Sequence, residues 1–130
     1  MKYEYNESIS ASALADLRHS VGWNRMENEY KNPLLTSYYH IAVYESDMLI
    51  AYIDCISNGV TDAYIQDLIV HPSYQGNGIG TDLMNKMIDY LKEKHIYMIS
   101  VIFDEFLLPF YKKFGFNNML CGQMQTYDCD

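Results

Sequence analysis

The sequence contains the run Ile65-Gln66-Asp67-Leu68-Ile69-Val70-His71-Pro72-Ser73-Tyr74-Gln75-Gly76-Asn77-Gly78-Ile79-Gly80, which leads directly into an amphipathic stretch over 81–94. This pattern predicts a buried strand, a short turn and a glycine-rich loop that opens a helix. The first N–H groups of a helix have no partner within the helix, and the helix dipole adds positive charge there. The run therefore predicts an anion-binding site, and a pyrophosphate suits it best.

Glycines alternate at 76, 78 and 80, so no Cβ atoms keep a ligand away from the loop backbone. Neither common phosphate-binding pattern matches this spacing. A P-loop requires Gly-Lys followed by Ser or Thr, and neither Lys nor Ser follows Gly80. A dinucleotide-binding loop requires G-x-G-x-x-G, which the alternating glycines do not provide.

The segment from Gln75 to Gly80 instead resembles the Q/R-x-x-G-x-G/A acetyl-CoA loop of the GCN5-related N-acetyltransferases, the GNAT superfamily. As in that family, a strand ending in Val-x-Pro precedes the loop, here at 70–72. A second element over 109–116, Pro-Phe-Tyr-Lys-Lys-Phe-Gly-Phe, resembles the family's F-Y-x-x-x-G-F segment. The resemblance is strong over residues 61–118.

The resemblance implies an α/β (α+β) fold, the GNAT fold, with a mixed, twisted β-sheet of about six to seven strands and helices on both faces. We expect one domain over 1–130. The sequence patterns predict the following order: strand 2–7, a helix capped by Ser10 and ending near His19, helix 23–32, hairpin strands 38–44 and 48–56, strand 61–70, helix 79–94, strand 96–103, helix 105–114 and a last strand over 122–127. Strands 61–70 and 96–103 should be parallel, and the family implies that they splay apart.

Composition limits the class of protein. The chain has 130 residues, 49% of them hydrophobic, and a net charge of −8. No run approaches the roughly 18 apolar residues of a membrane helix, and the start lacks a signal-peptide pattern, so we expect a cytoplasmic protein without a membrane partner. The negative charge argues against nucleic acid and is compatible with a cationic amine. Three cysteines without C-x-x-C spacing predict reduced thiols and no metal site.

The resemblance implies transfer of an acetyl group from acetyl-CoA, as cosubstrate, to a primary amine of a small molecule by direct attack in a ternary complex. A homodimer is a further possibility. Tyr111 has the family position of the general acid that protonates the leaving thiolate. The expected cofactor-binding residues are Leu68, Ile69, Val70, Gln75, Gly76, Asn77, Gly78, Ile79, Gly80, Thr81 and Asp104. Many relatives carry Lys or Arg where this chain has Asn77, so a distant cation such as Lys112 or Lys113 would have to fold close to the loop.

The general base stays open, because the two family positions for a carboxylate are Tyr64 and Ile99 here. The alternatives are a water relayed through Tyr64 or Gln66, and the carboxylates of Asp67, Asp54 and Glu27. The expected substrate residues are Trp23, Met26, Glu27 and Tyr30, with Tyr38 and Tyr39 nearby. The missing carboxylates also keep open a different class of function: a catalytically silent acetyl-CoA or CoA-binding module or sensor.

Overall fold

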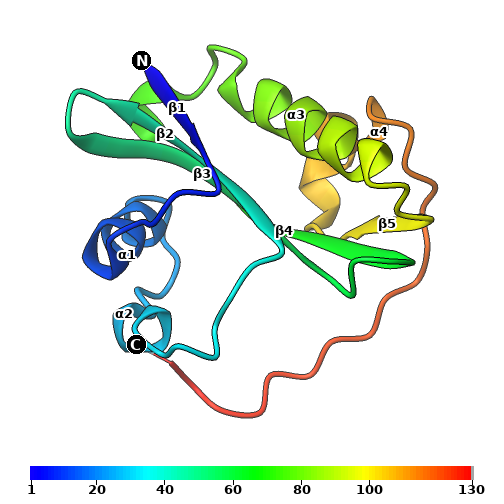
Figure 1. Ribbon diagram of the computed structural model, residues 1–130, viewed down its shortest axis with the longest axis horizontal. Helices are drawn as coiled ribbons and strands as arrows, with labels where there is room; N and C mark the ends of the chain where they lie inside the picture. Colours follow the sequence, from blue (N-terminus) through cyan, green and yellow to red (C-terminus); the bar gives the residue numbers. More distant parts are fainter. Residues whose placement is uncertain (130) are drawn as a thin grey trace.

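The computed structural model describes residues 1–129, and these form one mixed sheet with helices on both faces (Figure 1). The strands are β1 (Lys2–Tyr5), β2 (Tyr39–Glu45), β3 (Met48–Ser57), β4 (Asp62–Val70) and β5 (Met98–Val101). The helices are α1 (Ala11–Ser20), α2 (Glu27–Tyr30), α3 (Ile79–Glu93) and α4 (Leu108–Lys112), with 3-10 turns η1 (Pro72–Tyr74) and η2 (Glu105–Leu107). The expected mixed α/β class is confirmed.

The five strands lie in the sheet in chain order, and only the last pair, β4 and β5, is parallel. Helix α3 connects these two strands across one face, and α4 packs on the same side. Helices α1 and α2 lie on the other face (Figure 1). The sheet therefore separates two faces, each of which is free to carry its own site.

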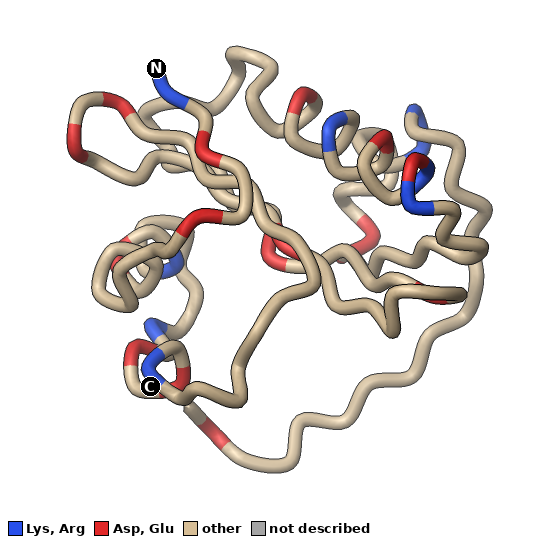
Figure 2. Tube along the Cα trace, in the orientation of Figure 1, with Lys and Arg blue, Asp and Glu red and all other residues tan. Residues whose placement is uncertain are grey.

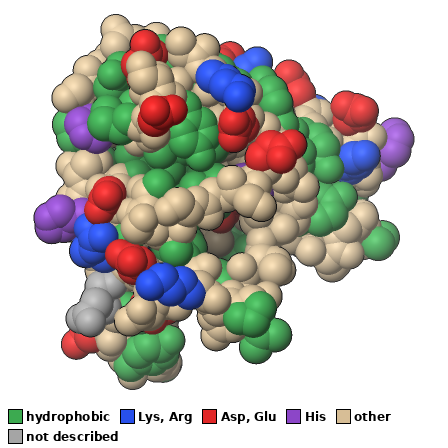
Figure 3. Space-filling model, turned by 60° about the vertical axis from the view of Figure 1, so that its left-hand side comes forward, with side chains coloured by type: hydrophobic (Ala, Val, Ile, Leu, Met, Phe, Trp, Pro, Cys, Tyr) green, Lys and Arg blue, Asp and Glu red, His purple; other side chains and the backbone are tan. Residues whose placement is uncertain are grey.

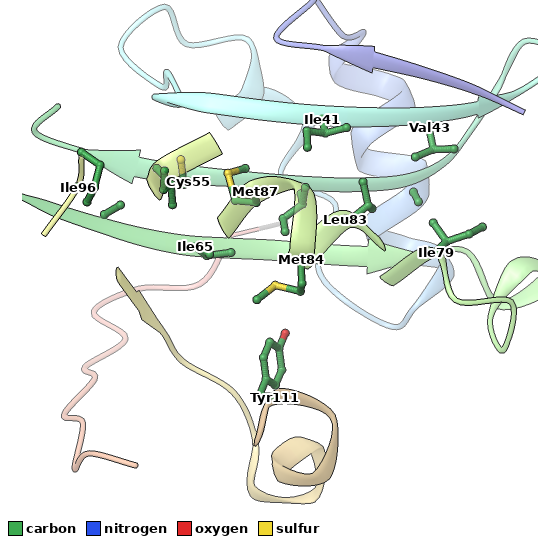
Figure 4. Close-up of a cluster of buried hydrophobic side chains, with 14 of the residues drawn as sticks. Ile41, Val43, Cys55, Ile65, Ile79, Leu83, Met84, Met87, Ile96 and Tyr111 are labelled. Carbon is green, nitrogen blue, oxygen red and sulfur yellow. The ribbon is translucent and has the colours of Figure 1, made fainter. Parts of the chain in front are cut away.

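Alternating side chains of the central strands build a core on each face. On the α3 face, Cys55 of β3 is fully buried with Leu83 and Met87 of α3 (Figure 4). Ile53 of β3 belongs to the same core. On the α1 face, Tyr52 packs with α1. This arrangement follows from the period of two in a strand, and from the helical spacing of the apolar residues in α3.

Strand β4 contains a β-bulge that decides the shape of the site. Tyr52 of β3 pairs with Ile69, whereas Asp54, two residues later, pairs with Gln66, three residues earlier on β4. The extra residue is accommodated because Asp67 adopts a left-handed backbone conformation, with φ of 54°. Pairing with β5 covers only 62–65 of β4, so beyond the bulge the two strands diverge.

Most predicted elements occur within about two residues of their expected bounds. The hydroxyl of Ser10 accepts a hydrogen bond from the Ala13 N–H at 3.3 Å and caps α1. The predicted helix over 23–32 is wrong in extent, because Met26 is left-handed and only Glu27–Tyr30 is helical. Strand β5 is also shorter than predicted.

The strand predicted over 122–127 is not formed, so the described sheet has five strands rather than six or seven. The backbone of this segment has no neighbouring strand with which to pair, and its apolar side chains, such as Met124, are exposed.

The Lys and Arg residues of the chain lie outside its central strands. The basic side chains lie mainly on or beside the helices (Figure 2), and the chain has no Lys or Arg between Lys31 and Lys86. Strands β2, β3 and β4 therefore carry no Lys or Arg.

Among the helices that residues 1–129 form, none is both long and apolar enough to cross a membrane.

Candidate active site

A cleft of about 490 Å³ opens at the fork between β4 and β5. Its lining comes from β4, the glycine loop, the first turn of α3 and the segment around α4: Leu68, Val70, Tyr74, Gln75, Gly76, Gly78, Ile79, Gly80, Thr81, Leu107, Phe110 and Tyr111. Most of the residues expected to contact the cofactor thus lie around one cavity. The cleft has an apolar wall and, at the loop, a backbone-rich end.

The backbone conformation of the loop favours glycine at two of its positions. Gly76 and Gly78 have φ of 83° and 82°, a region that costs an L-residue about 1–2 kcal/mol. Gly78 is the N-cap of α3, so the amides that follow it lack helical partners. At Gly80, a Cβ would lie 3.6 Å from the Phe110 ring and 3.7 Å from Val70, at the floor of the cleft.

Side chains of the loop hold it to the end of β4. The Gln75 side chain donates to the Val70 carbonyl at 2.9 Å, and the Asn77 side chain donates to the Tyr74 carbonyl at 3.2 Å. His71 accepts a hydrogen bond from the Ser73 N–H. Asn77 therefore fastens the turn and does not line the cleft.

A distant lysine brings a cation to the loop. The Lys113 ammonium, just after α4, donates to the Thr81 hydroxyl at 2.8 Å and lies 4.6 Å from the centre of the Phe110 ring. The loop itself contains no basic residue, so Lys113 is the cation placed nearest to the first turn of α3.

We expect Lys113→Met to weaken acetyl-CoA binding about two- to fivefold at low salt, because an exposed charge beside a phosphate contributes about 0.5–1 kcal/mol. The difference in acetyl-CoA affinity between the variant and the wild-type protein should shrink at high salt, because salt screens the charge. Calorimetric titration at two salt concentrations measures this difference in affinity. Lys112→Met, the neighbouring exposed lysine, is the matched control, and equal losses in both variants would contradict a specific role for Lys113.

Tyr111 is placed by aromatic packing. Its ring stacks on Phe103 at 4.4 Å between centroids and meets Phe110 edge-on at 4.9 Å. The side chain points from α4 toward α3 and the sheet (Figure 4), and only 7% of it is exposed. Burial, with a smaller contribution from Tyr64, raises the pKa of Tyr111 above its ordinary value. The hydroxyl therefore keeps its proton at neutral pH, as a proton donor must.

A second cavity of about 560 Å³ lies on the opposite face of the sheet, the face with α1 and α2, which is hollowed near its centre (Figure 3). Gln66 and Asp67 of β4 line this cavity, whereas the next residue, Leu68, lines the cleft at the fork. The residues that line the two cavities therefore adjoin one another at the bulge of β4.

Asp54 of β3 is the most unusual group in the second cavity. It is only 6% exposed; its Oδ2 accepts a hydrogen bond from the Tyr52 hydroxyl at 2.8 Å, and its buried Oδ1 has no partner within residues 1–129. Burial, and next the charge of Asp67, raise the pKa of Asp54 to about 7, although Tyr52 acts in the opposite direction. This carboxyl group therefore holds its proton to a much higher pH than an ordinary aspartate does.

Asp67 differs from Asp54 because it has a cation. The Arg18 guanidinium lies 3.4 Å from the Asp67 carboxylate, and the Tyr30 hydroxyl donates to the same oxygen at 3.4 Å. Arg18 is itself held by two hydrogen bonds to Asn24, at 2.6 and 2.7 Å. Burial raises the pKa of Asp67 above its ordinary value, and Arg18 partly offsets this rise.

Several predicted site residues do not reach either cavity. Ile69 turns its side chain into the α1-side core, and Tyr64 lines neither cavity. Asp104 is exposed and lines neither cavity, and its side chain makes no hydrogen bond to the 3-10 turn that follows it.

Of the expected substrate residues, Met26 and Tyr30 line the second cavity, but Trp23 and Glu27 do not. Glu27 forms ion pairs with Arg25 and Lys31, which makes it a poor base, and its pKa is lowered chiefly by Arg25. Tyr38 and Tyr39 were expected near the acceptor, yet they pack against Tyr90 of α3 on the other face.

The sequence patterns missed the pair formed by Tyr52 and Asp54, whose signal is the spacing of two that puts both side chains on one face of a strand. They also missed Phe110 as part of the cleft wall. No three His, Cys, Asp or Glu side chains gather into a metal-binding group within residues 1–129. The cysteines, of which Cys55 is buried, are all free thiols.

Comparison with known proteins agrees with this architecture. The model of the acetyltransferase (GNAT) family matches residues 7–116, and the chain belongs to this family. An uncharacterised N-acetyltransferase, ycf52-like, from Prochlorococcus marinus is 34% identical over 107 residues, which are 78% of this chain and 59% of that protein. The chain spans between 59% and 67% of the length of the four ycf52 relatives that it matches.

Solved structures show the same fold. A probable acetyltransferase from meticillin-resistant Staphylococcus aureus superposes with a TM-score of 0.84 at 24% identity, covering 97% of this chain and all of that one. A predicted acetyltransferase from Clostridium acetobutylicum, solved with acetyl-CoA, gives a TM-score of 0.73 at 21% identity, with 96% and 95% covered. The GNAT resemblance is thus confirmed.

Proposed function

We propose that this protein is an acetyl-CoA-dependent N-acetyltransferase that transfers an acetyl group to the primary amine of a small molecule, by direct attack in a ternary complex. The observation that carries the proposal is the forked cleft, which has unpaired helix amides at one end and the Tyr111 side chain in its wall. The solved neighbour with acetyl-CoA supports the choice of cosubstrate.

Different parts of the cleft bind different parts of acetyl-CoA. The amides of 76–81 and the Lys113 ammonium hold the pyrophosphate, which the dipole of the 15-residue helix α3 also favours. Beyond the bulge, the backbone of 68–70 has no strand partner on the β5 side, so it is free to bind the pantetheine arm and the thioester carbonyl. Tyr111 then protonates the departing thiolate.

The second cavity supports a ternary complex. It lies on the other face of β4 from the cleft, and consecutive residues, Asp67 and Leu68, line the two. Both ligands can therefore be bound at once, and their reacting ends can meet at the bulge. A mechanism in which the enzyme itself carries the acetyl group is not needed for such an arrangement.

Binding of acetyl-CoA is tested by thermal unfolding. We expect one molecule to bind and to raise Tm, because only the folded protein presents the loop amides; at 100 times Kd the gain is about 2.7 kcal/mol. Gly80→Val should abolish this shift while the protein stays folded, since the added methyl groups occupy the cleft floor. Gly122→Val is the matched control, because nothing lies within 4 Å of that position. No shift of the wild-type protein at millimolar acetyl-CoA would refute the proposal.

Catalysis is tested with amines, polyamines, amino acids and aminoglycosides in the presence of acetyl-CoA, with release of free thiol as the signal. We expect acceptor-dependent release with at least one amine. Acetyl-CoA binding without release from any acceptor would instead favour a silent acetyl-CoA or CoA-binding module.

A further inference from the structure

We propose that Asp54 binds the ammonium group of the acceptor and takes its proton, and that the acceptor is a small monoamine with an apolar body. The inference rests on the proposed acetyltransferase function and adds to it a base and a class of substrate. It concerns the second cavity, on the α1 face of the sheet, and not the cleft at the fork.

The first argument is the unpartnered oxygen. Only 6% of Asp54 is exposed to solvent. Its side chain lines the cavity, yet Oδ1 accepts no hydrogen bond within residues 1–129. A buried carboxylate oxygen without a partner is unfavourable, because it has lost its hydrogen bonds to water and gained none within the protein. An ammonium group in the cavity supplies both the missing donor and the missing positive charge.

The second argument is the count of charges around the cavity. Asp67 already pairs with Arg18, which also donates two hydrogen bonds to Asn24, so Asp54 is the one lining carboxylate without a cation among the described residues. This count allows one ammonium group rather than several. Arg18 is the one Lys or Arg among the lining residues, and its charge is already paired with Asp67, which disfavours a carboxylate or phosphate on the acceptor.

The third argument is the rest of the wall. Aliphatic and thioether side chains form one part of it: Ile9, Leu14, Met26, Leu35 and Ile56. This part of the cavity suits the apolar body of a small molecule. Neutral polar side chains, such as Thr36, Ser37 and Gln66, belong to the rest of the lining and can bind a few polar groups of the acceptor.

The chemical step balances as follows. Asp54 accepts one proton from the ammonium group, and the neutral nitrogen attacks the thioester carbonyl carbon. The C–N bond forms, the C–S bond breaks with its electron pair on sulfur, and Tyr111 protonates the sulfur. The second proton lost by the nitrogen restores Tyr111, and Asp54 releases its proton to solvent. The products are one amide, one thiol and one proton.

Several charged or titratable groups face Asp54 from the elements around it. They are Tyr52 on its own strand, His40 opposite it on β2, Asp67 on β4, Arg18 on α1 and Tyr30 on α2. Asp67 disfavours ionisation of Asp54, whereas Tyr52, the nearby Gln66 side chain and Arg18 favour it, although Gln66 does not reach hydrogen-bond geometry with Oδ1. Because burial raises the pKa of Asp54 to about 7, we expect the acidic limb of the kcat/KM profile near pH 7.

The first experiment uses Asp54→Asn, with any acceptor that the wild-type protein acetylates. We expect kcat/KM to fall on the order of 10²-fold, the acidic limb to disappear, and the acetyl-CoA-induced rise in Tm to persist. Asp89→Asn, an exposed carboxylate on α3, is the matched control. Tyr52→Phe should move the acidic limb to higher pH, because it removes the hydrogen bond to Oδ2. Unchanged kcat/KM and an unchanged limb in Asp54→Asn would overturn the role of Asp54.

The second experiment compares acceptors of matched length at one pH: alkyl and arylalkyl monoamines, the corresponding diamines, and amino acids. We expect the monoamines to have the highest kcat/KM, by at least tenfold. A preference for diamines or amino acids would overturn the substrate class while leaving the acetyltransferase function intact. Failure of acetyl-CoA itself to bind would instead refute the proposed function, so the two failures are distinguishable.

Discussion

Replacing Tyr111 with Phe is expected to lower kcat on the order of 10²-fold while the acetyl-CoA KM changes far less. The change removes one hydroxyl group and little volume, so the stacking on Phe103 and the contact with Phe110 should persist. Binding of acetyl-CoA should therefore remain, and only the proton for the leaving thiolate should be lost.

The pH dependence of kcat tests this role of Tyr111. A thiol with a pKa near 8.5 leaves readily as an anion at high pH, so the loss should be largest below about pH 7.5. Tyr97→Phe is the matched control, because that side chain is 81% exposed. Equal rates of Tyr111→Phe and the wild-type protein below pH 7.5 would make Tyr111 a packing residue only.

A second large effect concerns stability. We expect the free energy of unfolding of Asp54→Asn, relative to the wild-type protein, to increase by about 3 kcal/mol between pH 5 and pH 8. The pKa of Asp54 is raised to about 7 in the folded protein, against about 3.9 in an unfolded chain. In the window between these values the folded state holds a proton that the unfolded state has lost, so wild-type stability falls as the pH rises. The Asn side chain does not titrate, so the stability of Asp54→Asn does not fall with pH for this reason.

Urea unfolding at several pH values measures the difference. Asp62→Asn, at the exposed start of β4, is the control and should show no such trend. A difference between Asp54→Asn and the wild-type protein that stays constant from pH 5 to pH 8 would show that Asp54 titrates normally. An Asn variant that is more stable but less active would also fit a site that keeps an uncompensated charge for function.

The local patterns of the sequence were sufficient for the loop and its helix. Val70-His71-Pro72 ends a strand, the glycines allow φ values that other residues avoid, and the apolar spacing of α3 identifies its buried face. These properties depend on neighbours within one or two turns of chain. The predictions for the hairpin and for the cap at Ser10 were accurate for the same reason.

Other predictions failed because they depend on contacts between distant segments. The strand over 122–127 needs a neighbouring strand, and its local pattern cannot supply one. Tyr38 and Tyr39 belong to the acceptor side only if the hairpin presents that face, but its register turns them toward Tyr90.

The sequence by itself determined the anion-binding loop, the fold class and the family, because short-range backbone preferences and one motif suffice for each. Only the tertiary structure decided which ionisable groups are unusual. Asp54, Asp67 and Glu27 are equivalent carboxylates in the sequence. In the structure Arg18 pairs with Asp67, and Arg25 and Lys31 pair with Glu27, but no cation within residues 1–129 pairs with Asp54. Burial and charge pairing are set by residues far apart in the chain, so the protonation of Asp54 and the place of Lys113 are properties of the fold.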